Sequence, residues 1–207
     1  MAVANPAGEP RQAIYKPIRG ERPLHDFPVG TLALRERAAY LLSEATGWRI
    51  VPPTVLRDGP LGEGMVQAWR DEDPAADIVA MLRAADRRLR RIAIFDVLAN
   101  NADRKGGHLI AVPGGHVHGV DHGICFAAEP KLRTVLWAWR GERLTRAELT
   151  VVERVGKELD GSLGSALGEL LSPREVAATR QRARRLAGSA TFPQPDPDRP
   201  AVPWPPF

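Results

Sequence analysis

The sequence predicts an α+β fold with a two-lobed outline, and three observations lead to this prediction. Short apolar runs separated by proline- and glycine-containing turns fill the first third of the chain and are typical of a small antiparallel sheet. Longer stretches with helical periodicity follow. Hydrophobic residues make up 43% of the 207 residues and charged residues 26%, a balance typical of a globular protein that buries a core.

The composition also excludes several classes of protein. No apolar run approaches the roughly 20 residues that a membrane-spanning helix needs, so we expect no membrane span. The N-terminus lacks the charged start and apolar stretch of a secretory signal. A single cysteine, Cys125, excludes an internal disulfide framework and fits a reducing compartment, so we expect a cytoplasmic protein. The net charge of +4 permits an anionic partner without requiring one.

The N-terminal part predicts a short sheet with one helix. Residues 13–16 are typical of a strand, and Thr31 is a candidate cap for a helix that Gly47 ends. Two further strands are expected, at residues 50–56 and 65–69, because apolar pairs there flank prolines and a glycine-containing turn.

The next segment predicts a helix from Asp77 to Asn100, with apolar residues recurring on one face. Much of its remaining surface is arginine, which favours a solvated face, whereas the alternative is an anion-binding surface. The arginines concerned are Arg83, Arg87, Arg88, Arg90 and Arg91.

A hairpin and two helices are expected after this helix. The hairpin joins residues 109–112 to residues 116–120 through a glycine-containing turn. Each helix begins with the pattern of a capping box, in which a hydroxyl and a glutamate three residues later bond each other's backbone. The pairs are Thr145 with Glu148 and Ser172 with Glu175, and Gly188 is expected to end the second helix.

We divide the chain into three parts. Residues 1–70 hold the short sheet and one helix, residues 71–190 are mainly helical with the hairpin inserted, and residues 191–207 form an irregular tail with seven of the 19 prolines. Either Trp204 and Phe207 hold this tail against the rest of the protein, or the tail is free. A cleft between the two larger parts is a common place for a ligand.

The most informative stretch lies between the long helix and the hairpin. Asp103 stands at the entrance of the hairpin and Asp121 at its far end, and turns of this kind bring two carboxylates to one cation. Kinases need such a pair, because one carboxylate accepts or orients the proton of the attacking hydroxyl and the other holds magnesium against phosphate oxygens. They also need an early strand lysine paired with a helix glutamate, and Lys16 and Glu36 stand in that order.

The segments that follow this order are Tyr15-Lys16-Pro17, Glu36, Ala39-Tyr40-Leu41-Leu42-Ser43, Val51-Pro52-Pro53-Thr54, Gln67, Asn101-x-Asp103-Arg104 and Val120-Asp121-x-Gly123. In these segments the chain resembles the phosphatidylinositol 3-/4-kinase-like family, in particular its actinobacterial branch. The resemblance covers roughly residues 13–145. It implies a protein-kinase-like fold in which residues 1–70 are a reduced N-lobe, without the usual glycine-rich loop strands, and residues 71–190 are the C-lobe.

The resemblance also implies a role for each matching residue. Lys16 would bind the phosphates of ATP, and Glu36 would orient Lys16. Asp103 would be the catalytic base, with Arg104 as its catalytic neighbour, and Asp121 would be the principal magnesium ligand. The hinge against adenine would consist of Val66, Gln67, Ala68 and Trp69.

The implied activity is transfer of the γ-phosphoryl group of ATP to a hydroxyl, with Mg²⁺ or Mn²⁺ as the cofactor. The acceptor stays open among a lipid headgroup, a small molecule and a protein. Residues 122–140 would correspond to an activation loop. Within it Trp137 and Trp139 alternate as on a strand, which favours a core position over the alternative of lipid contact.

Two features depart from the family's pattern. The family's metal-binding asparagine is His108 here. Imidazole is a softer ligand than an amide oxygen, so manganese, a contact through water and a weakened second metal site are alternatives. Residues 1–12 are polar and turn-rich and do not supply the two strands of a loop that covers the phosphates. Either that loop is absent or the protein begins upstream of this chain.

Two other functions stay open. A kinase-like fold without a phosphate loop would be a pseudokinase that acts as a nucleotide-binding or scaffold protein. The run from His116 to His122 resembles the His-x-His-x-Asp-His motif of the metallo-β-lactamase family, although one extra residue separates His118 from Asp121; it would make the protein a zinc hydrolase. No nucleic acid is expected as a partner, because no recognised binding module surrounds the arginines.

Overall fold

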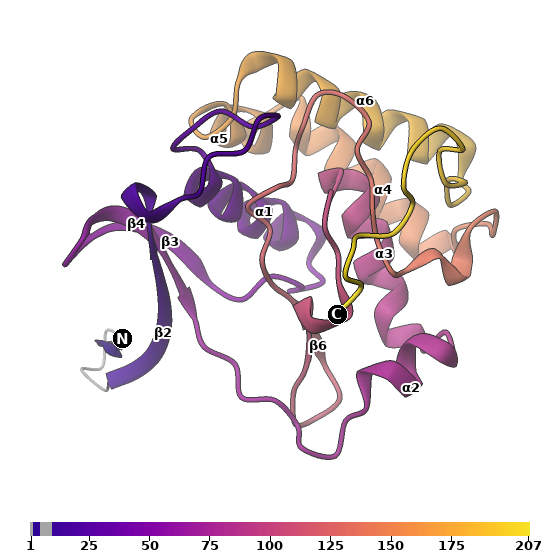
Figure 1. Ribbon diagram of the computed structural model, residues 1–207. Coiled ribbons are helices and arrows are strands. Elements are labelled where there is room, and N and C mark those ends of the chain that lie inside the picture. Colours follow the sequence, from indigo (N-terminus) through magenta and orange to yellow (C-terminus); the bar gives the residue numbers. More distant parts are fainter. Residues whose placement is uncertain (1, 5–9) are drawn as a thin grey trace.

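The fold is α+β, as the sequence predicts. The computed structural model describes residues 2–4 and 10–207. Within these ranges the chain forms six α-helices, a four-stranded sheet and a two-stranded sheet, which Figure 1 shows with the helices gathered on one side of the larger sheet.

The larger sheet is antiparallel, with β4 between β2 and β3 and with β1 beyond β2 at the edge. In this register Lys16 pairs with Met65. The tight approach of β2 and β4 requires a glycine at position 64, since a Cβ there would lie 2.4 Å from the carbonyl oxygen of Lys16. The strands are β1 (Ala2–Ala4), β2 (Pro10–Pro17), β3 (Thr54–Gly59) and β4 (Gly62–Ala68).

The first two strands differ from the prediction for residues 1–12. The sequence indicates a turn-rich segment there, whereas Ala2–Ala4 forms a strand and β2 already begins at Pro10. A three-residue strand without polar alternation carries no strand signal of its own; its hydrogen bonds to β2 define it.

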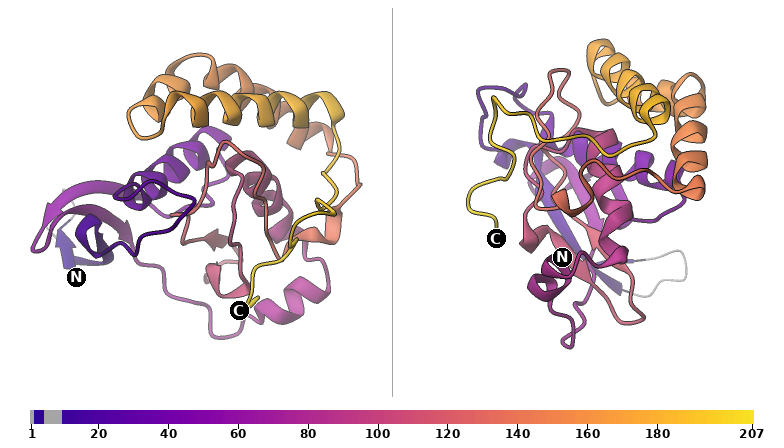
Figure 2. Two further views of the ribbon diagram at one scale, coloured as in Figure 1. Left: turned by 45° about the horizontal axis from the view of Figure 1, so that its top comes forward. Right: turned by 90° about the vertical axis from the view of Figure 1, so that its right-hand side faces the viewer.

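Helix α1 (Leu32–Thr46) lies between the sheet and the later helices (Figure 2). Its first N–H groups, those of Leu32 and Ala33, donate to the carboxylate of Glu21, which therefore caps the helix in place of the Thr31 side chain. Gly47, with φ of 70°, ends the helix as predicted.

The helix predicted from Asp77 to Asn100 is two helices, α2 (Ile78–Arg83) and α3 (Arg87–Ala99). The chain breaks at Ala85, which has a left-handed φ of 50°. The side chain of Asp86 then accepts a hydrogen bond from the Arg88 N–H and starts the second helix. Apolar periodicity continues across the break, which is why the sequence alone does not locate it.

One arginine of this region is not solvated. Arg90 is only 13% exposed and pairs with Glu142 and Glu148, and it also donates to the carbonyl oxygen of Arg143. It therefore fastens α3 to the start of the next helix. The other four, Arg83, Arg87, Arg88 and Arg91, are exposed.

Three helices complete the core: α4 (Arg146–Leu159), α5 (Ser162–Gly168) and α6 (Pro173–Ser189). Both predicted capping boxes are present. Helix α5 carries no cap signal and was not predicted. Helix α6 continues past Gly188 and ends at Ala190, whose φ of 49° supplies the left-handed turn.

A buried arginine connects the first helix to the last. Arg35 of α1 is 1% exposed and places its guanidinium 2.5 Å from the carboxylate of Glu175 in α6. It also donates to the carbonyl oxygen of Cys125, in the loop that follows the hairpin. Cys125 is fully buried, and burial raises the pKa of its thiol well above the ordinary value, which disfavours the thiolate that a nucleophile needs.

The predicted hairpin is present as β5 (Leu109–Ala111) and β6 (Val117–Gly119). Its position is fixed by the segment before β3, because the N–H of Gly119 donates to the carbonyl oxygen of Ile50. The hairpin thus brings Asp121, two residues after β6, to the end of β2 in the larger sheet.

The tail returns across the loop that follows the hairpin (Figures 1 and 2). The carbonyl oxygen of Ala201 accepts from the Thr134 N–H and from the indole of Trp137. Trp204 is 89% exposed, so it does not hold the tail against the protein, whereas Phe207 packs on Gly106. Trp137 and Trp139 lie on a 3₁₀ turn, not on a strand, although Trp139 is buried as expected.

None of the helices in the described ranges combines the length and apolar character needed to cross a bilayer.

Candidate functional site

Three charged residues from distant parts of the chain meet at one point. The ammonium of Lys16, on β2, lies 3.1 Å from a carboxylate oxygen of Glu36, on α1. The same ammonium lies 2.5 Å from Oδ1 of Asp121, just after β6. The side chains of Lys16 and Asp121 are 46% and 52% exposed, so a ligand in solution has access to both, while Glu36 is buried beneath them.

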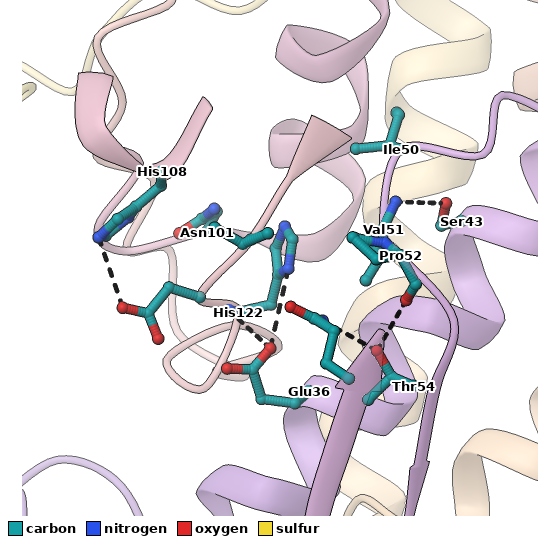
Figure 3. A network of polar contacts seen from close by, with 12 residues as sticks. Glu36, Ser43, Ile50, Val51, Pro52, Thr54, Asn101, His108 and His122 are labelled. Carbon is teal, nitrogen blue, oxygen red and sulfur yellow. Dashed lines mark hydrogen bonds and ion pairs between the residues drawn. The ribbon is translucent and has the colours of Figure 1, made fainter. Parts of the chain in front are cut away.

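Asp121 stands in a conformation that its neighbours hold in place. Its φ is 62°, in the left-handed region that residues other than glycine seldom adopt. The next N–H, of His122, donates to Oε2 of Glu36 at 3.0 Å. One carboxylate, Glu36, therefore fixes both Lys16 and the peptide after Asp121, as Figure 3 shows for Glu36 and His122.

His108 is the fourth member of the group. Its Nε2 lies 3.5 Å from Oδ2 of Asp121; in Figure 3 the ring extends from the loop before β5 toward the group around Glu36 and His122. Its Nδ1 is buried and makes no hydrogen bond within the described residues. Burial lowers the pKa of His108, against the opposing pull of Asp121 and Asp103, so the ring is neutral at physiological pH and able to donate a lone pair.

Lys16 and Asp121 each stabilise the charged form of the other. Burial opposes the charge of Lys16, but Glu36 and Asp121 outweigh it and raise the pKa of Lys16 above its ordinary value. Burial also opposes the charge of Asp121, but Lys16 outweighs it and lowers the pKa of that carboxyl. Burial dominates at Glu36 and raises the pKa of its carboxyl. Lys16 and Asp121 are therefore both ionised at neutral pH.

A buried ion pair supports the loop that carries the other carboxylate. Arg104 and Asp96 are both fully buried, and the guanidinium contacts both oxygens of the carboxylate at 2.9 to 3.2 Å. Arg104 also donates to the carbonyl oxygen of Val120 and lies 2.6 Å from Nε2 of His122. Arg104 thus connects the loop after α3 to both neighbours of Asp121, and it does so from inside the core, without reaching the surface.

The loop itself is closed by an asparagine. Asn101 donates through its side-chain amide to Asp96, and its side-chain oxygen accepts from the N–H of Asp103. The Asp103 carboxylate is half-buried and lies 3.3 Å from the ammonium of Lys105. Asp103 and Asp121, the two carboxylates predicted to cooperate, both act electrostatically on His108 and oppose the lowering of its pKa.

The predicted hinge lies along and just beyond β4. Val66 and Gln67 are buried, and the Gln67 amide donates to the hydroxyl of Thr54. The N–H groups of Ala68 and Trp69 are bonded to the carbonyl oxygens of Pro53 and Gln12. Their donors are therefore engaged within the protein.

The histidine run does not form a zinc site. His116 bonds to the carbonyl oxygen of Arg49 and His118 to that of Ile50, whereas His122 is fully buried against Arg104. No group of three or more His, Cys, Asp and Glu side chains suited to a metal ion occurs in residues 2–4 and 10–207. The three histidine rings contact three different partners and do not converge on one point, so the ligands that a zinc hydrolase needs are not brought together.

Two contributors escape analysis of the sequence. The first is Asp96 of α3, which is the acceptor for Arg104, Asn101 and the hydroxyl of Thr134. The available signal is a carboxylate on the apolar face of a helix, eight residues before an arginine. His122 had no comparable signal, because its role depends on the left-handed turn at Asp121.

Comparison with known proteins finds relatives that differ in sequence identity and in how much of the chain they match. No protein-family profile matches the chain. Phosphatidylinositol 4-kinase gamma 4 of Oryza sativa subsp. japonica is 30% identical over 159 residues, and the Arabidopsis thaliana protein of the same name is 28% identical over 171 residues. Each match covers 67% of this chain but only 27% and 28% of the plant proteins, so the chain spans about a quarter of their length.

A second comparison covers nearly the whole chain. Protein Rv2133c of Mycobacterium tuberculosis (strain ATCC 25618 / H37Rv) is 44% identical over 229 residues, which include 94% of this chain and 82% of that protein. The similarity to the plant kinases is thus distant and partial, whereas this one extends over both chains. The chain belongs to the same family as protein Rv2133c of Mycobacterium tuberculosis.

Proposed function

We propose that this protein is a kinase-like phosphotransferase that binds ATP with a divalent cation and transfers the γ-phosphoryl group to a hydroxyl. The observation that carries the proposal is the meeting of Lys16, Glu36 and Asp121 from three separate elements. The partial similarity to plant phosphatidylinositol 4-kinases gamma supports it. In this proposal residues 1–70 are a reduced N-lobe, residues 71–190 are the C-lobe, and the protein works in the cytoplasm.

Lys16 is the phosphate clamp of the proposal. An ammonium held by two carboxylates is fixed in position without being withdrawn from solvent, because its side chain is 46% exposed. When ATP binds, oxygens of its triphosphate replace Asp121 as partners of Lys16, while Glu36 keeps the ammonium in place. The exchange frees Asp121 for a cation.

The residues present fit a magnesium or manganese ion brought by the nucleotide. Asp121 supplies a carboxylate, and neutral His108 supplies an imidazole whose other nitrogen is buried and makes no hydrogen bond to any residue that the structure describes. Magnesium typically takes one or two protein ligands and completes its shell with water and phosphate oxygens, and the imidazole favours manganese further. When bound, the cation neutralises charge on the phosphates.

Asp103 is the proposed base. It lies at the surface of the loop that Asn101 closes, half-buried, where an acceptor hydroxyl has access to it. Its role is to orient that hydroxyl and accept the proton. Arg104 acts as a positioning residue, since its guanidinium is fully buried and joins this loop to the backbone beside Asp121.

The proposed hinge is the segment from Val66 to Trp69. The N–H groups of Ala68 and Trp69 are already bonded, so adenine would use the carbonyl groups of Val66 to Trp69 or the residues that follow. The acceptor is a lipid headgroup, a small molecule or a protein hydroxyl.

The test is isothermal titration of ATP into the protein with magnesium, with manganese and with chelator, followed by release of ADP with candidate acceptors. Saturable binding that requires the metal and turnover with an acceptor support the proposal. Metal-dependent binding without turnover for any acceptor class identifies a nucleotide-binding pseudokinase. Absence of binding under all three conditions overturns the proposal.

A further inference from the structure

A large pocket lies apart from the charged group just described. Its volume is about 760 Å³, and it is enclosed by the loop after β6, by α6, by the tail and by residues 24–27 before α1. In Figure 1 the tail runs beside the loop after β6, and the two are joined where Arg199 donates to the carbonyl oxygen of Pro130. None of Lys16, Glu36 and Asp121 lines it.

The wall of this pocket carries an excess of positive charge. Two of its cations are neutralised, since Lys131 pairs with Asp26 and Arg199 lies 3.6 Å from Asp196. The remaining cations have no carboxylate at ion-pair distance in the described part of the chain; they are Arg133, Arg182 and Arg185.

Arg182 is the clearest of the three. Its guanidinium donates to the carbonyl oxygens of Leu98 and Ala127 and to the hydroxyl of Thr179, so neutral groups hold it rigidly. Burial lowers its pKa to about 10, which still leaves it charged at neutral pH. A largely buried cation without a counter-ion is costly, and an anion in the pocket would relieve that cost.

Arg133 and Arg185 extend the positive wall toward solvent. Arg133 donates through Nε to the carbonyl oxygen of Ala102, which lies directly before Asp103. This bond leaves the two terminal nitrogens of its guanidinium without a carboxylate partner. Arg185 is exposed on α6, one turn from Arg182. Guanidinium groups are suited to phosphate oxygens, which accept two parallel hydrogen bonds from each fork.

Another part of the wall is apolar. Phe27, Val97, Ile124 and Trp137 line it. A pocket of this size with aromatic and aliphatic walls accommodates the organic part of a ligand, whereas inorganic phosphate would fill only the cationic end.

We propose that this pocket binds a phosphate-bearing organic anion, with the phosphate at Arg133, Arg182 and Arg185 and the organic part against the apolar wall. The site is separate from the nucleotide site and does not depend on phosphoryl transfer. The phosphate belongs either to a soluble phosphomonoester or to the headgroup of an anionic lipid.

Two probes distinguish these sources. Phenyl phosphate is titrated into the protein by calorimetry, with phenol as the neutral control. Vesicles of phosphatidylcholine with and without phosphatidic acid are tested by flotation. Arg185→Gln removes one pocket cation, and Arg184→Gln is the matched control, since Arg184 directly precedes Arg185 in α6 and pairs with Asp160 outside the pocket. Lys16→Met disables the nucleotide site.

Saturable binding of either probe is expected to weaken at least tenfold in Arg185→Gln and to stay unchanged in Arg184→Gln and Lys16→Met. Phenyl phosphate binding assigns a soluble ligand, and binding confined to phosphatidic acid vesicles assigns a lipid headgroup. The proposal is overturned if neither probe binds, if Arg184→Gln weakens binding as much as Arg185→Gln, or if Lys16→Met abolishes it. Because Lys16→Met is examined separately, failure of this pocket and failure of the nucleotide site are distinguishable.

Discussion

The ammonium of Lys16 lies 2.5 Å from Oδ1 of Asp121, although 105 residues separate the two in the sequence. This contact joins β2 of the larger sheet to the segment that follows the β5–β6 hairpin. Glu36 reinforces it from below by bonding to Lys16 and to the N–H that follows Asp121. The distance leaves no space for a cation between the two groups, so in the proposed function the metal ion and the phosphates would separate them.

Replacement of Asp121 by asparagine should abolish metal-dependent ATP binding with little loss of stability. The amide keeps the shape of the side chain but removes the charge that a cation needs, and the carboxylate is 52% exposed, so the fold loses little. Calorimetric titration with magnesium measures the effect, and Asp198→Asn in the exposed tail is the control. Wild-type ATP affinity in Asp121→Asn would remove Asp121 from the metal site.

Replacement of Asp103 by asparagine should leave ATP binding intact and lower turnover about 10²- to 10⁴-fold, the usual contribution of a general base. The half-buried carboxylate bonds to Lys105 and not to the Lys16 group, so the nucleotide site is unchanged. Steady-state release of ADP, compared with ATP affinity in the same preparation, separates the two effects. Unchanged turnover would exclude Asp103 as the base.

Replacement of Arg104 by methionine should destabilise the protein by about 3–5 kcal/mol, because it leaves the charge of Asp96 buried and unpaired. Arg174→Met is the control, since the Arg174–Glu129 pair is 79% and 51% exposed and should contribute about 0–1 kcal/mol. Chemical denaturation measures both free energies of unfolding. Equal losses in the two variants would contradict the structural role of Arg104.

Stability should fall as the pH drops from about 6.5 to 4, partly through His118. Burial, assisted by His116 and Arg70, lowers the pKa of His118 to about 4. Between these values the unfolded chain binds a proton that the folded protein excludes, so acid favours unfolding, by at most about 3 kcal/mol. His122, fully buried and with its pKa lowered well below the ordinary value, acts in the same direction.

Denaturation of wild type and His118→Gln at pH 7, 5 and 4 measures this contribution. The variant should lose part of the pH dependence, since glutamine is able to replace the bond to the Ile50 carbonyl oxygen but does not titrate. The same slope in both proteins would mean that folding does not lower the pKa of His118.

Local signals in the sequence predicted much of the fold. The capping boxes at Thr145 and Ser172 are present because each satisfies backbone donors with residues only three positions apart. The hairpin after His108 and the end of α1 at Gly47 are local for the same reason. The break at Ala85 was missed, because a left-handed alanine has no signature in composition or periodicity.

The site was predictable as a set of residues but not as an arrangement. The order of Lys16, Glu36 and Asp121 indicates a kinase-like group, and these side chains do meet. The burial of Glu36, by contrast, depends on a distant segment, since its carboxylate accepts from the N–H of His122, 86 residues later. The basic pocket combines α6, the tail and the loop after β6, so no single stretch of sequence indicates it.

The contact between Phe207 and Gly106 has a practical consequence for protein engineering. The Gly106 N–H donates to the carbonyl oxygen of Pro206, and a Cβ on Gly106 would overlap the Phe207 ring. An affinity tag or fluorescent fusion attached after Phe207 would therefore begin beside Gly106, which follows Asp103 by three positions in the sequence. Such a label would crowd the proposed acceptor side, and the same proximity makes position 207 a suitable place for a reporter dye that senses occupancy there.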